Sequence, residues 1–407
     1  MQRYDLAIVG AGPAGSATAI RAARGGARVV MFERSVPGRD KVCGDGLTPR
    51  AVNALLELGI SSDKAHRIKG LRMIAGSTRR TLSWPPGTRF GVHGAVWPRR
   101  KLDKYLTETA AAAGVEIIWN TEALPVFDDS GVVIGTQADG QQFLADMVVL
   151  SAGAHGRAAR LLGVERVIGE PFGLAIRSYA SSPRHAEHHI EACLTLRDSK
   201  EAWLPGYGWI FPAGDGTVNV GVGTLSTMKH FRALNLNRLL EVYRQQVTDE
   251  WKLGEYLQKP RAWRLPMSST RRYGAGWAAV GDSAGLINPM NGEGIDYALE
   301  SGTLLADLFL DDPSTAPETY DQIIGERFDS FLRTGRRFSF LIAHPWILRN
   351  GLRLAVGTQA ISEITLQVMG NFVDHETRGA ANAVLKAANR GLACFERFDR
   401  VLRRTKA

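Results

Sequence analysis

Residues 4–33 read YDLAIVGAGPAGSATAIRAARGGARVVMFE, which predicts a buried strand, a glycine-rich turn, a helix and a second buried strand. The turn, Gly10-Ala11-Gly12-Pro13-Ala14-Gly15, has the spacing G-x-G-x-x-G. Its first glycine allows a tight turn, the second lets a pyrophosphate approach the backbone, and the third lets helix and strand pack closely. Glu33 ends the second strand, where an acidic side chain can bind a pair of ribose hydroxyls. The stretch therefore predicts a Rossmann-type dinucleotide-binding unit.

Composition limits the class of protein. The chain has 407 residues, of which 44% are apolar and 22% charged, as expected for a globular protein of two joined domains. Its cysteines (Cys43, Cys193 and Cys394) lie far apart, which argues against a disulfide scaffold and fits a reducing cytoplasm. The formal net charge of +9 suits nucleic acid, acidic substrates or an anionic membrane, but no nucleic-acid-binding motif is present.

Two further motifs follow in order. Arg99 opens the pattern R-x-x-L-D at the start of a predicted helix. Residues 277–280 predict a short buried strand that runs into Gly281-Asp282, and residues 286–294 (LINPMNGEG) lead into a helix from Ile295. Between these motifs, residues 170–225 alternate strands and turns, which predicts an antiparallel sheet.

In these motifs the sequence resembles the glutathione-reductase-type flavoproteins of the p-hydroxybenzoate hydroxylase branch. The pattern Tyr-x-Trp-x-Phe-Pro at 207–212, a later Gly-x-Gly at 221–223, and Lys-x-Cys-Gly-Asp-Gly at 41–46 resemble more narrowly the geranylgeranyl reductase family. The runs CGDGLTPRAV, LPGYGWIFP and NPMNGEGIDYALE are similar to those of actinobacterial menaquinone reductases. The resemblance implies FAD as cofactor and a polyprenyl lipid or quinone as substrate. The implied reaction saturates an isoprenoid double bond, in this case one isoprene unit of the menaquinone side chain.

The resemblance also implies a set of site residues. Those expected to bind the cofactor are Gly10, Gly12, Pro13, Ala14, Gly15, Glu33, Arg34, Cys43, Gly44, Asp45, Gly46, Arg99, Gly281, Asp282, Gly292, Gly294 and Ile295. Those expected to bind the substrate are Tyr207, Trp209, Phe211, Pro212 and Gly221.

Roles follow for some of these residues. Gly292 and Gly294 open a helix whose N–H groups and dipole are expected to stabilise charge near flavin N1. Cys43, Tyr207 and an ordered water are the candidate proton donors, and a space-filling role for Cys43 stays open. The aromatic residues at 207, 209 and 211 are expected to wall an apolar tunnel, although sheet packing alone also explains them. No metal is expected, because His185, His188 and His189 lack partners at ligand spacing.

The predicted fold class is α/β. A Rossmann-type, glutathione-reductase-like FAD domain is expected over residues 1–165 and 259–312. An inserted antiparallel-sheet substrate domain is expected over residues 166–258, with a contribution from residues 66–98. Residues 313–407 are expected to form a helical C-terminal region.

One departure bears on the electron donor. The branch usually carries an Asp-Gly pair after the strand that ends at Leu150, whereas this chain has Ala152-Gly153. Direct use of NAD(P)H is therefore in doubt, and the donor is either NAD(P)H or a protein or other external reductant. The alternative functions are a geranylgeranyl diphosphate or geranylgeranyl-lipid reductase, a flavin monooxygenase or halogenase, and a non-catalytic prenyl-binding escort protein.

A basic, apolar segment suggests membrane contact. Residues 338–348 (FSFLIAHPWIL) follow Arg336 and Arg337 and precede Arg349 and Arg353, as in segments that lie at a bilayer interface. A buried helix would show the same periodicity. Residues 390–406 add a second basic amphipathic stretch. No apolar run reaches the ~20 residues of a spanning helix. We therefore expect a cytoplasmic protein bound peripherally at the inner face of the membrane, with its oligomeric state left open.

Overall fold

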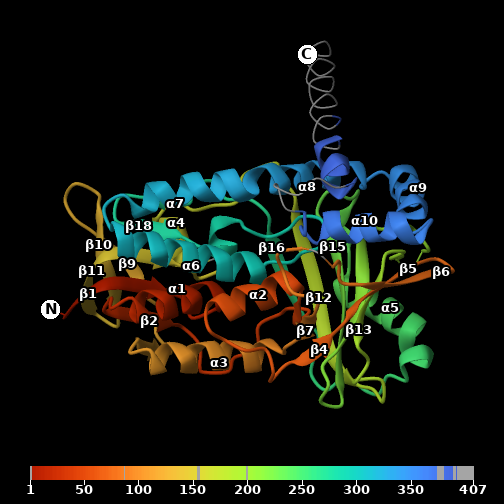
Figure 1. Ribbon diagram of the computed structural model, residues 1–407, viewed down its shortest axis with the longest axis horizontal. Coiled ribbons are helices and arrows are strands. Elements are labelled where there is room, and N and C mark those ends of the chain that lie inside the picture. Colours follow the sequence, from red (N-terminus) through yellow and green to blue (C-terminus); the bar gives the residue numbers. More distant parts are fainter. Residues whose placement is uncertain are drawn as a thin grey trace, which may run out of the picture.

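The computed structural model describes residues 2–86, 88–153, 156–198, 200–373, 380–387 and 391. Two large sheets lie one after the other along the long axis of the molecule, and the C-terminal helices extend across both (Figure 1). This arrangement confirms the predicted fold class, a mixed α/β protein with one largely parallel and one largely antiparallel sheet. No helix in the part of the chain with described structure is long and apolar enough to span a membrane.

The first sheet has eight strands and a parallel centre. β18, β11, β1, β2 and β8 are parallel neighbours, while β17 and the β9–β10 pair run antiparallel at its margins. The strands are β1 (Gln2–Val9), β2 (Val29–Glu33), β8 (Glu116–Trp119), β9 (Leu124–Phe127), β10 (Val133–Ala138), β11 (Gln141–Leu150), β17 (Tyr273–Gly274) and β18 (Trp277–Ala279).

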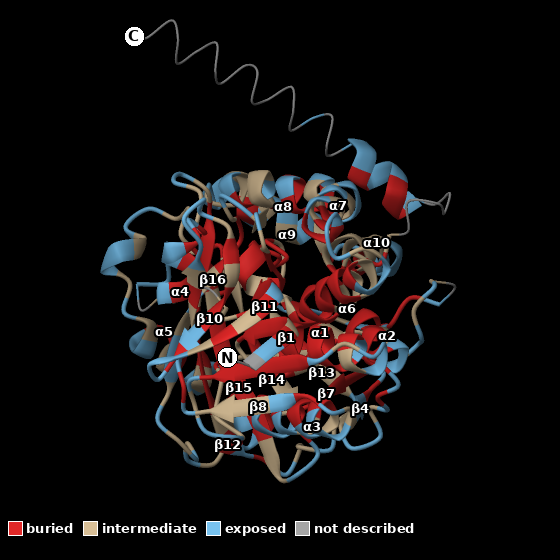
Figure 2. Cartoon of the chain, turned by 90° about the vertical axis from the view of Figure 1, so that its left-hand side faces the viewer, coloured by how far each residue is buried: buried red, intermediate tan, exposed pale blue. Residues whose placement is uncertain are grey.

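The helices of this half pack tightly because small residues face one another. α1 (Pro13–Arg24) starts with a proline, which suits the first helical position, and it is buried over most of its length (Figure 2). It packs against α6 (Ile295–Asp311), where a Cβ on Gly302 would lie 2.4 Å from the Ala14 carbonyl oxygen. The other helices of this half are α2 (Pro49–Glu57), α3 (Arg99–Ala112), α4 (Arg157–Leu161) and the 3₁₀ turn η2 (Gly281–Ala284).

The second sheet has seven strands, antiparallel apart from the β13–β5 pair. In order across the sheet they are β16 (Arg261–Pro266), β12 (Phe172–Ser181), β15 (Thr217–Leu225), β14 (Gly206–Pro212), β13 (His189–Cys193), β5 (Gly70–Ala75) and β6 (Thr78–Ser83). A small third sheet joins β3 (Gly46–Leu47), β7 (Gly94–Val96) and β4 (His66–Ile68).

One face of the seven-stranded sheet is covered by α5 (Leu236–Trp251), which follows the 3₁₀ turn η1 (Phe231–Ala233). Side chains alternate along β14, so Gly208 and Ile210 face this helix, and a Cβ on Gly208 would lie 2.5 Å from the Tyr243 ring. The odd-numbered residues of β14 therefore face the opposite side.

The C-terminal helices follow α6. They are α7 (Ala316–Ile324), the π-helical turn η3 (Gly325–Asp329), α8 (Ser330–Leu341), α9 (Pro345–Ala355) and α10 (Gln359–Met369). Val356, Leu366 and Phe372 of this region pack with Leu82 and Trp84 in one apolar core. The predicted basic stretch over residues 390–406 and Cys394 lie outside the described residues, apart from residue 391.

α5 ends at Trp251, where Lys252 adopts a left-handed conformation (φ 48°). One element departs from the expected domain boundaries. The strand β16, which the expected boundary at residue 259 places in the FAD domain, pairs instead with β12 in the seven-stranded sheet.

Candidate active site

One large cavity joins the two sheets and the C-terminal helices. Its volume is about 970 Å³, and it reaches from the glycine-rich turn after β1, past β14, to α9 and α10. Polar groups of the turn and of residues 39–48 line one end. Apolar side chains such as Leu352, Ile361 and Ile364 line the other end. The cavity can therefore hold a long molecule with a polar part and an apolar part.

The glycine-rich turn has the geometry expected of a pyrophosphate cradle. A Cβ on Gly10 would lie 2.5 Å from the Ser151 carbonyl oxygen, and one on Gly15 would lie 2.0 Å from the Gly10 carbonyl oxygen. At Gly12, in contrast, the nearest atom would be 3.9 Å away, on Arg39. The first and third glycines thus allow close backbone packing, while the second leaves open space at the N-terminus of α1.

Glu33 lies beside this turn at the end of β2. Its Oε2 accepts a hydrogen bond from the Ala11 backbone N–H at 3.1 Å, and its Oε1 accepts from Ser35 N–H at 3.1 Å and from Arg39 Nε at 3.3 Å. The neighbouring Arg34 also lines the cavity. These contacts fix the carboxylate at the cavity wall, where it can bind hydroxyl groups.

A second helix N-terminus faces the same cavity. Gly292, Gly294 and Ile295, at the start of α6, line it together with Asp282. A Cβ on Gly294 would lie 3.3 Å from Asp282 Oδ1, so the carboxylate lies directly beside the helix start. The N–H groups of α6 and the N–H groups of α1 therefore both reach one cavity.

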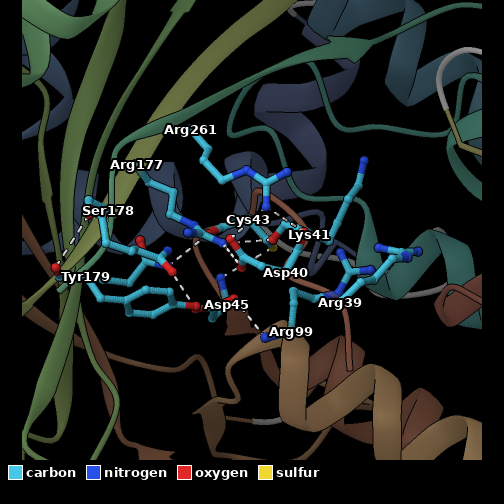
Figure 3. A network of polar contacts seen from close by, with 12 residues as sticks. Arg39, Asp40, Lys41, Cys43, Asp45, Arg99, Arg177, Ser178, Tyr179 and Arg261 are labelled. Atoms are coloured by element: carbon cyan, nitrogen blue, oxygen red, sulfur yellow. Dashed lines mark hydrogen bonds and ion pairs between the residues drawn. The ribbon is translucent and has the colours of Figure 1, made fainter. Parts of the chain in front are cut away.

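The loop of residues 39–46 is held by a buried polar network (Figure 3). Arg177 of β12 donates to the Cys43 carbonyl oxygen at 3.2 Å and to the Lys41 carbonyl oxygen at 3.0 Å, and it pairs with Asp40. Arg261 of β16 also pairs with Asp40, at 3.3 Å. The second sheet thus holds the loop in place through the side chains of Arg177 and Arg261.

Asp45 is the centre of this network. Its carboxylate accepts hydrogen bonds from Arg99 N–H at 3.1 Å, from Asn219 Nδ2 at 2.8 Å and from the Tyr179 hydroxyl. Burial raises the pKa of Asp45, and the hydrogen bonds from Tyr179 and Asn219 oppose that shift. Asp45 lines the cavity, and its buried carboxylate, held by three protein donors, fixes the loop in place.

Arg99 adjoins the same network. Its guanidinium forms two hydrogen bonds with Asp103, at 2.7 and 2.8 Å, inside α3. The pair explains the R-x-x-L-D spacing, because residues four apart meet on one helix face. Arg99 also lines the cavity.

An aromatic row forms the cavity wall on β14. Tyr207, Trp209 and Phe211 lie on one face of the strand, with ring centroids 5.8 Å and 6.3 Å apart in succession. A Cβ on Gly44 would lie 2.9 Å from the Phe211 ring, so the loop that carries Cys43 passes directly over this row. The row and the loop together enclose the middle of the cavity.

Two of the candidate proton donors lie at this point. The Cys43 sulfur accepts a hydrogen bond from Asp45 N–H at 3.3 Å, and burial raises the pKa of its thiol. The Tyr207 hydroxyl donates to the Asn291 carbonyl oxygen, and burial raises its pKa as well. Both groups therefore keep their protons at neutral pH.

Four of the expected contact residues do not line the cavity: Gly15, Pro212, Gly221 and Gly281. A Cβ on Gly221 would lie 2.1 Å from the Trp209 ring, so this glycine makes room for the indole. Gly281 has a positive φ of 57°, and its N–H donates to Ser301 Oγ at 3.0 Å. Gly221 and Gly281 thus shape the backbone around the site.

Comparison with known proteins agrees with this geometry. The family model described as FAD binding domain matches residues 3–311. The menaquinone reductase of Mycobacterium tuberculosis is 36% identical over 383 residues, covering 92% of each chain. The digeranylgeranylglycerophospholipid reductase of Thermoplasma volcanium is 29% identical over 81% of this chain and 85% of its own. A geranylgeranyl bacteriochlorophyll reductase-like protein from Thermoplasma acidophilum superposes with a TM-score of 0.78 at 25% identity, covering 95% of this chain and 100% of the other.

The chain belongs to the geranylgeranyl reductase family of FAD-dependent oxidoreductases.

The cavity of this reductase fits FAD. The open position at Gly12 suits the pyrophosphate, Glu33 suits the ribose of the adenosine half, and Asp282 with the start of α6 suits the flavin half. When bound, FAD supplies the hydride, and the side chains described above bind, orient and exclude water.

Sequence reasoning did not identify several residues of the reductase site. Arg177, Tyr179 and Asn219 hold the Cys43 loop from the second sheet. Lys41 belongs to a quoted motif, but its ammonium lies 3.6 Å from the Trp263 ring centroid, a contact that no sequence pattern announces. The sequence signal available for Arg177 and Asn219 was a polar side chain within a predicted strand, because such a side chain needs hydrogen-bond partners when it is buried.

Proposed function

We propose that this reductase saturates one isoprenoid double bond in the side chain of menaquinone. The observation that carries the proposal is the single cavity that begins at the FAD-binding turn and ends among apolar side chains of α9 and α10. A polyprenyl chain is long, apolar and flexible, and such a cavity buries it along its length. The 36% identity to a mycobacterial menaquinone reductase supports the choice of a quinone.

The chemistry of an isolated alkene supports the placement of the aromatic row. With no carbonyl to polarise the bond, hydride reaches one carbon while a proton reaches the other, and positive charge builds on the more substituted carbon. The electron-rich faces of Tyr207 and Trp209 stabilise such a charge. Cys43 and Tyr207 are the protein's candidate proton donors, with an ordered water as the third candidate.

We also propose peripheral contact with an anionic membrane through α8 and α9. Trp346 and Leu354 are 76% and 66% exposed, and Arg349 and Arg353 lie on the same helix, α9. Leu354 also lines the cavity, so exposed apolar surface and substrate cavity meet there. A prenyl tail entering at this point would leave lipid without crossing water.

The catalytic proposal is tested anaerobically. The purified FAD-bound protein is photoreduced, menaquinone or geranylgeranyl diphosphate is added, and the flavin spectrum and product mass are followed. Reoxidation with a gain of about two mass units in the menaquinone tail, the mass of two hydrogens, is expected. The same gain in the diphosphate alone would reassign the substrate to geranylgeranyl compounds. No reoxidation until oxygen enters would favour a monooxygenase or halogenase, and a protein without FAD would favour an escort protein.

Two variants separate the proton donors. Cys43→Ala and Tyr207→Phe each remove one acidic hydrogen, and loss of the donor should lower turnover by ~10²–10⁴-fold. Photoreduction of the FAD should be unchanged in the same variant. If neither variant slows turnover, water is the donor.

Membrane contact is tested by flotation with anionic liposomes at low and high salt. We expect binding that salt weakens and that Trp346→Glu with Leu354→Glu abolishes. Matched substitution of the exposed Leu56, on α2, should leave binding intact. The absence of flotation in both salts would contradict the proposal.

A further inference from the structure

Glu293 lies at the junction of the two halves of the site. It precedes the N-cap of α6 and lines the cavity. The Thr48 hydroxyl, at the start of α2, donates to its Oε1, and Asn291 Nδ2 donates to its Oε2 at 3.3 Å. No step described above uses this carboxyl group.

The side chains next to Glu293 carry more negative than positive charge when all of them are ionised. Arg50 of α2 binds Glu300 through two hydrogen bonds, 2.5 and 2.9 Å long, and lies 3.7 Å from Asp296. Asp296 is completely buried, and neither of its carboxyl oxygens has a hydrogen-bond partner among the described residues. Three carboxyl groups thus share one guanidinium, and burying the surplus negative charge is costly.

A proton on one or two carboxyl groups removes this cost. Burial raises the pKa of Asp296 well above its ordinary value, which favours its protonated form. Burial raises the pKa of Glu293 to about 7, opposed by the hydrogen bond from Thr48 and by the charge of Arg50. Glu300 remains the ion-pair partner of Arg50. Glu293 is therefore the group whose protonation changes near neutral pH.

The groups around Glu293 show which charge can change its protonation state. Arg50 faces it from α2, Asp296, Tyr297 and Glu300 face it from α6, and Tyr207 faces it from β14. Burial raises the pKa of both tyrosines, so neither carries charge at neutral pH. The remaining variable is charge in the cavity itself, where the start of α6 and Asp282 suit the flavin half of FAD.

We propose that Glu293 is a redox-linked proton acceptor, which takes up a proton when two electrons enter the site. An external two-electron reductant supplies the electrons; one proton goes to the cofactor, and a second binds the Glu293 carboxylate. Added negative charge in a low-dielectric cavity favours the neutral form of a nearby carboxyl group. The inference rests on the proposed function only through the presence of FAD, and its test contains no isoprenoid.

The test counts protons. The FAD-bound protein is photoreduced without oxygen, with EDTA as electron source, in weak buffer with a pH indicator, at several values between pH 6 and 9. Above pH 7 we expect the unaltered protein to take up one more proton per flavin than Glu293→Gln does. Glu318→Gln, a surface change on α7, is the matched control and should behave like the unaltered protein.

Thr48 provides a second, independent variant. Thr48→Val removes the hydrogen bond that favours the carboxylate, so the pH range of extra uptake should move up by about one unit. Thr48→Ser restores the hydroxyl and should restore the range. Infrared difference spectra of the unaltered protein should gain a protonated-carboxyl band on reduction above pH 7. Equal proton uptake by the unaltered protein and Glu293→Gln at every pH would overturn the proposal. If Glu293→Gln does not bind FAD, coincident ranges for Thr48→Val and Thr48→Ser would overturn it, whatever the outcome with menaquinone.

Discussion

The side-chain amide of Asn219 donates to the carbonyl oxygen of Cys43 at 2.8 Å, and this bond joins β15 to the loop over the cavity. The same amide nitrogen donates to Asp45 Oδ2 at 2.8 Å, while the amide oxygen accepts from Trp209 Nε1 at 2.9 Å. One buried side chain thus connects the aromatic row, the Cys43 loop and its central carboxylate.

Asn219→Ala should therefore cost more than a typical hydrogen-bond deletion. It leaves the Trp209 N–H without its acceptor and Asp45 without one donor, and each unsatisfied buried group costs ~1–3 kcal/mol. We expect the free energy of unfolding to fall by at least ~2 kcal/mol and FAD to bind more weakly, as measured by denaturant unfolding and flavin titration. Asn53→Ala, on the exposed face of α2, is the control. An unchanged unfolding free energy would show that the network is not stabilising.

The glycines of the first turn should separate folding from cofactor binding. Gly12→Ala places a methyl group in open space, so the unfolding temperature of the FAD-free protein should stay near that of the unaltered chain, while FAD affinity falls by ~10-fold or more. Gly15→Ala places it 2.0 Å from a backbone oxygen and should lower the unfolding temperature itself. Calorimetry and flavin titration of both variants decide the matter. Equal loss of stability in the two would contradict the division of roles.

The apolar end of the cavity should set the accepted length of the tail. Leu352→Trp adds volume where α9 lines the cavity, so kcat/KM for a long-tailed menaquinone should drop by ~10-fold or more, with a two-isoprene analogue affected less. The comparison requires that the Leu352→Trp protein bind as much FAD as the unaltered protein and unfold at the same temperature. A parallel loss for both substrates would place the tail elsewhere.

Lys41 should make the stability of the FAD-free protein depend on pH. Burial lowers the pKa of Lys41 to about 8, opposed by the charge of Asp282. Below pH 8 both the folded and unfolded chains hold the proton, and the burial penalty is complete. Between pH 8 and the ordinary lysine range of about 10.4 only the unfolded chain holds it, so this contribution to stability rises with pH. Lys41→Met should flatten that rise in unfolding free energy measured at pH 7.5, 8.5 and 9.5. Parallel curves for the two proteins would refute the assignment.

Much of the site could be predicted from sequence because its signals are local. The turn at residues 10–15, Glu33, and the alternation of Tyr207, Trp209 and Phe211 each depend on residues close together in the chain. The periodicity of a strand is enough to place three aromatic rings on one face.

The remainder depends on contacts that span the chain. Asp45 and Asn219 are 174 positions apart, and nothing near either residue announces the pairing. The motif around Asp45 is local, but the three protein donors to its carboxylate come from α3, β12 and β15. Similarly, the membership of β16 in the second sheet is decided by its pairing with β12, about ninety residues earlier.

The close contact of α1 and α6 has a consequence for the choice of cofactor. Because Gly302 has no Cβ, α6 lies directly against the Ala14 backbone of α1, and this backbone contact fixes the distance between the N-termini of the two helices. A site with a fixed distance between its two ends selects ligands by their length. FMN carries the flavin and one phosphate but lacks the adenosine half that would lie beside Glu33, so the protein should bind FMN more weakly than FAD.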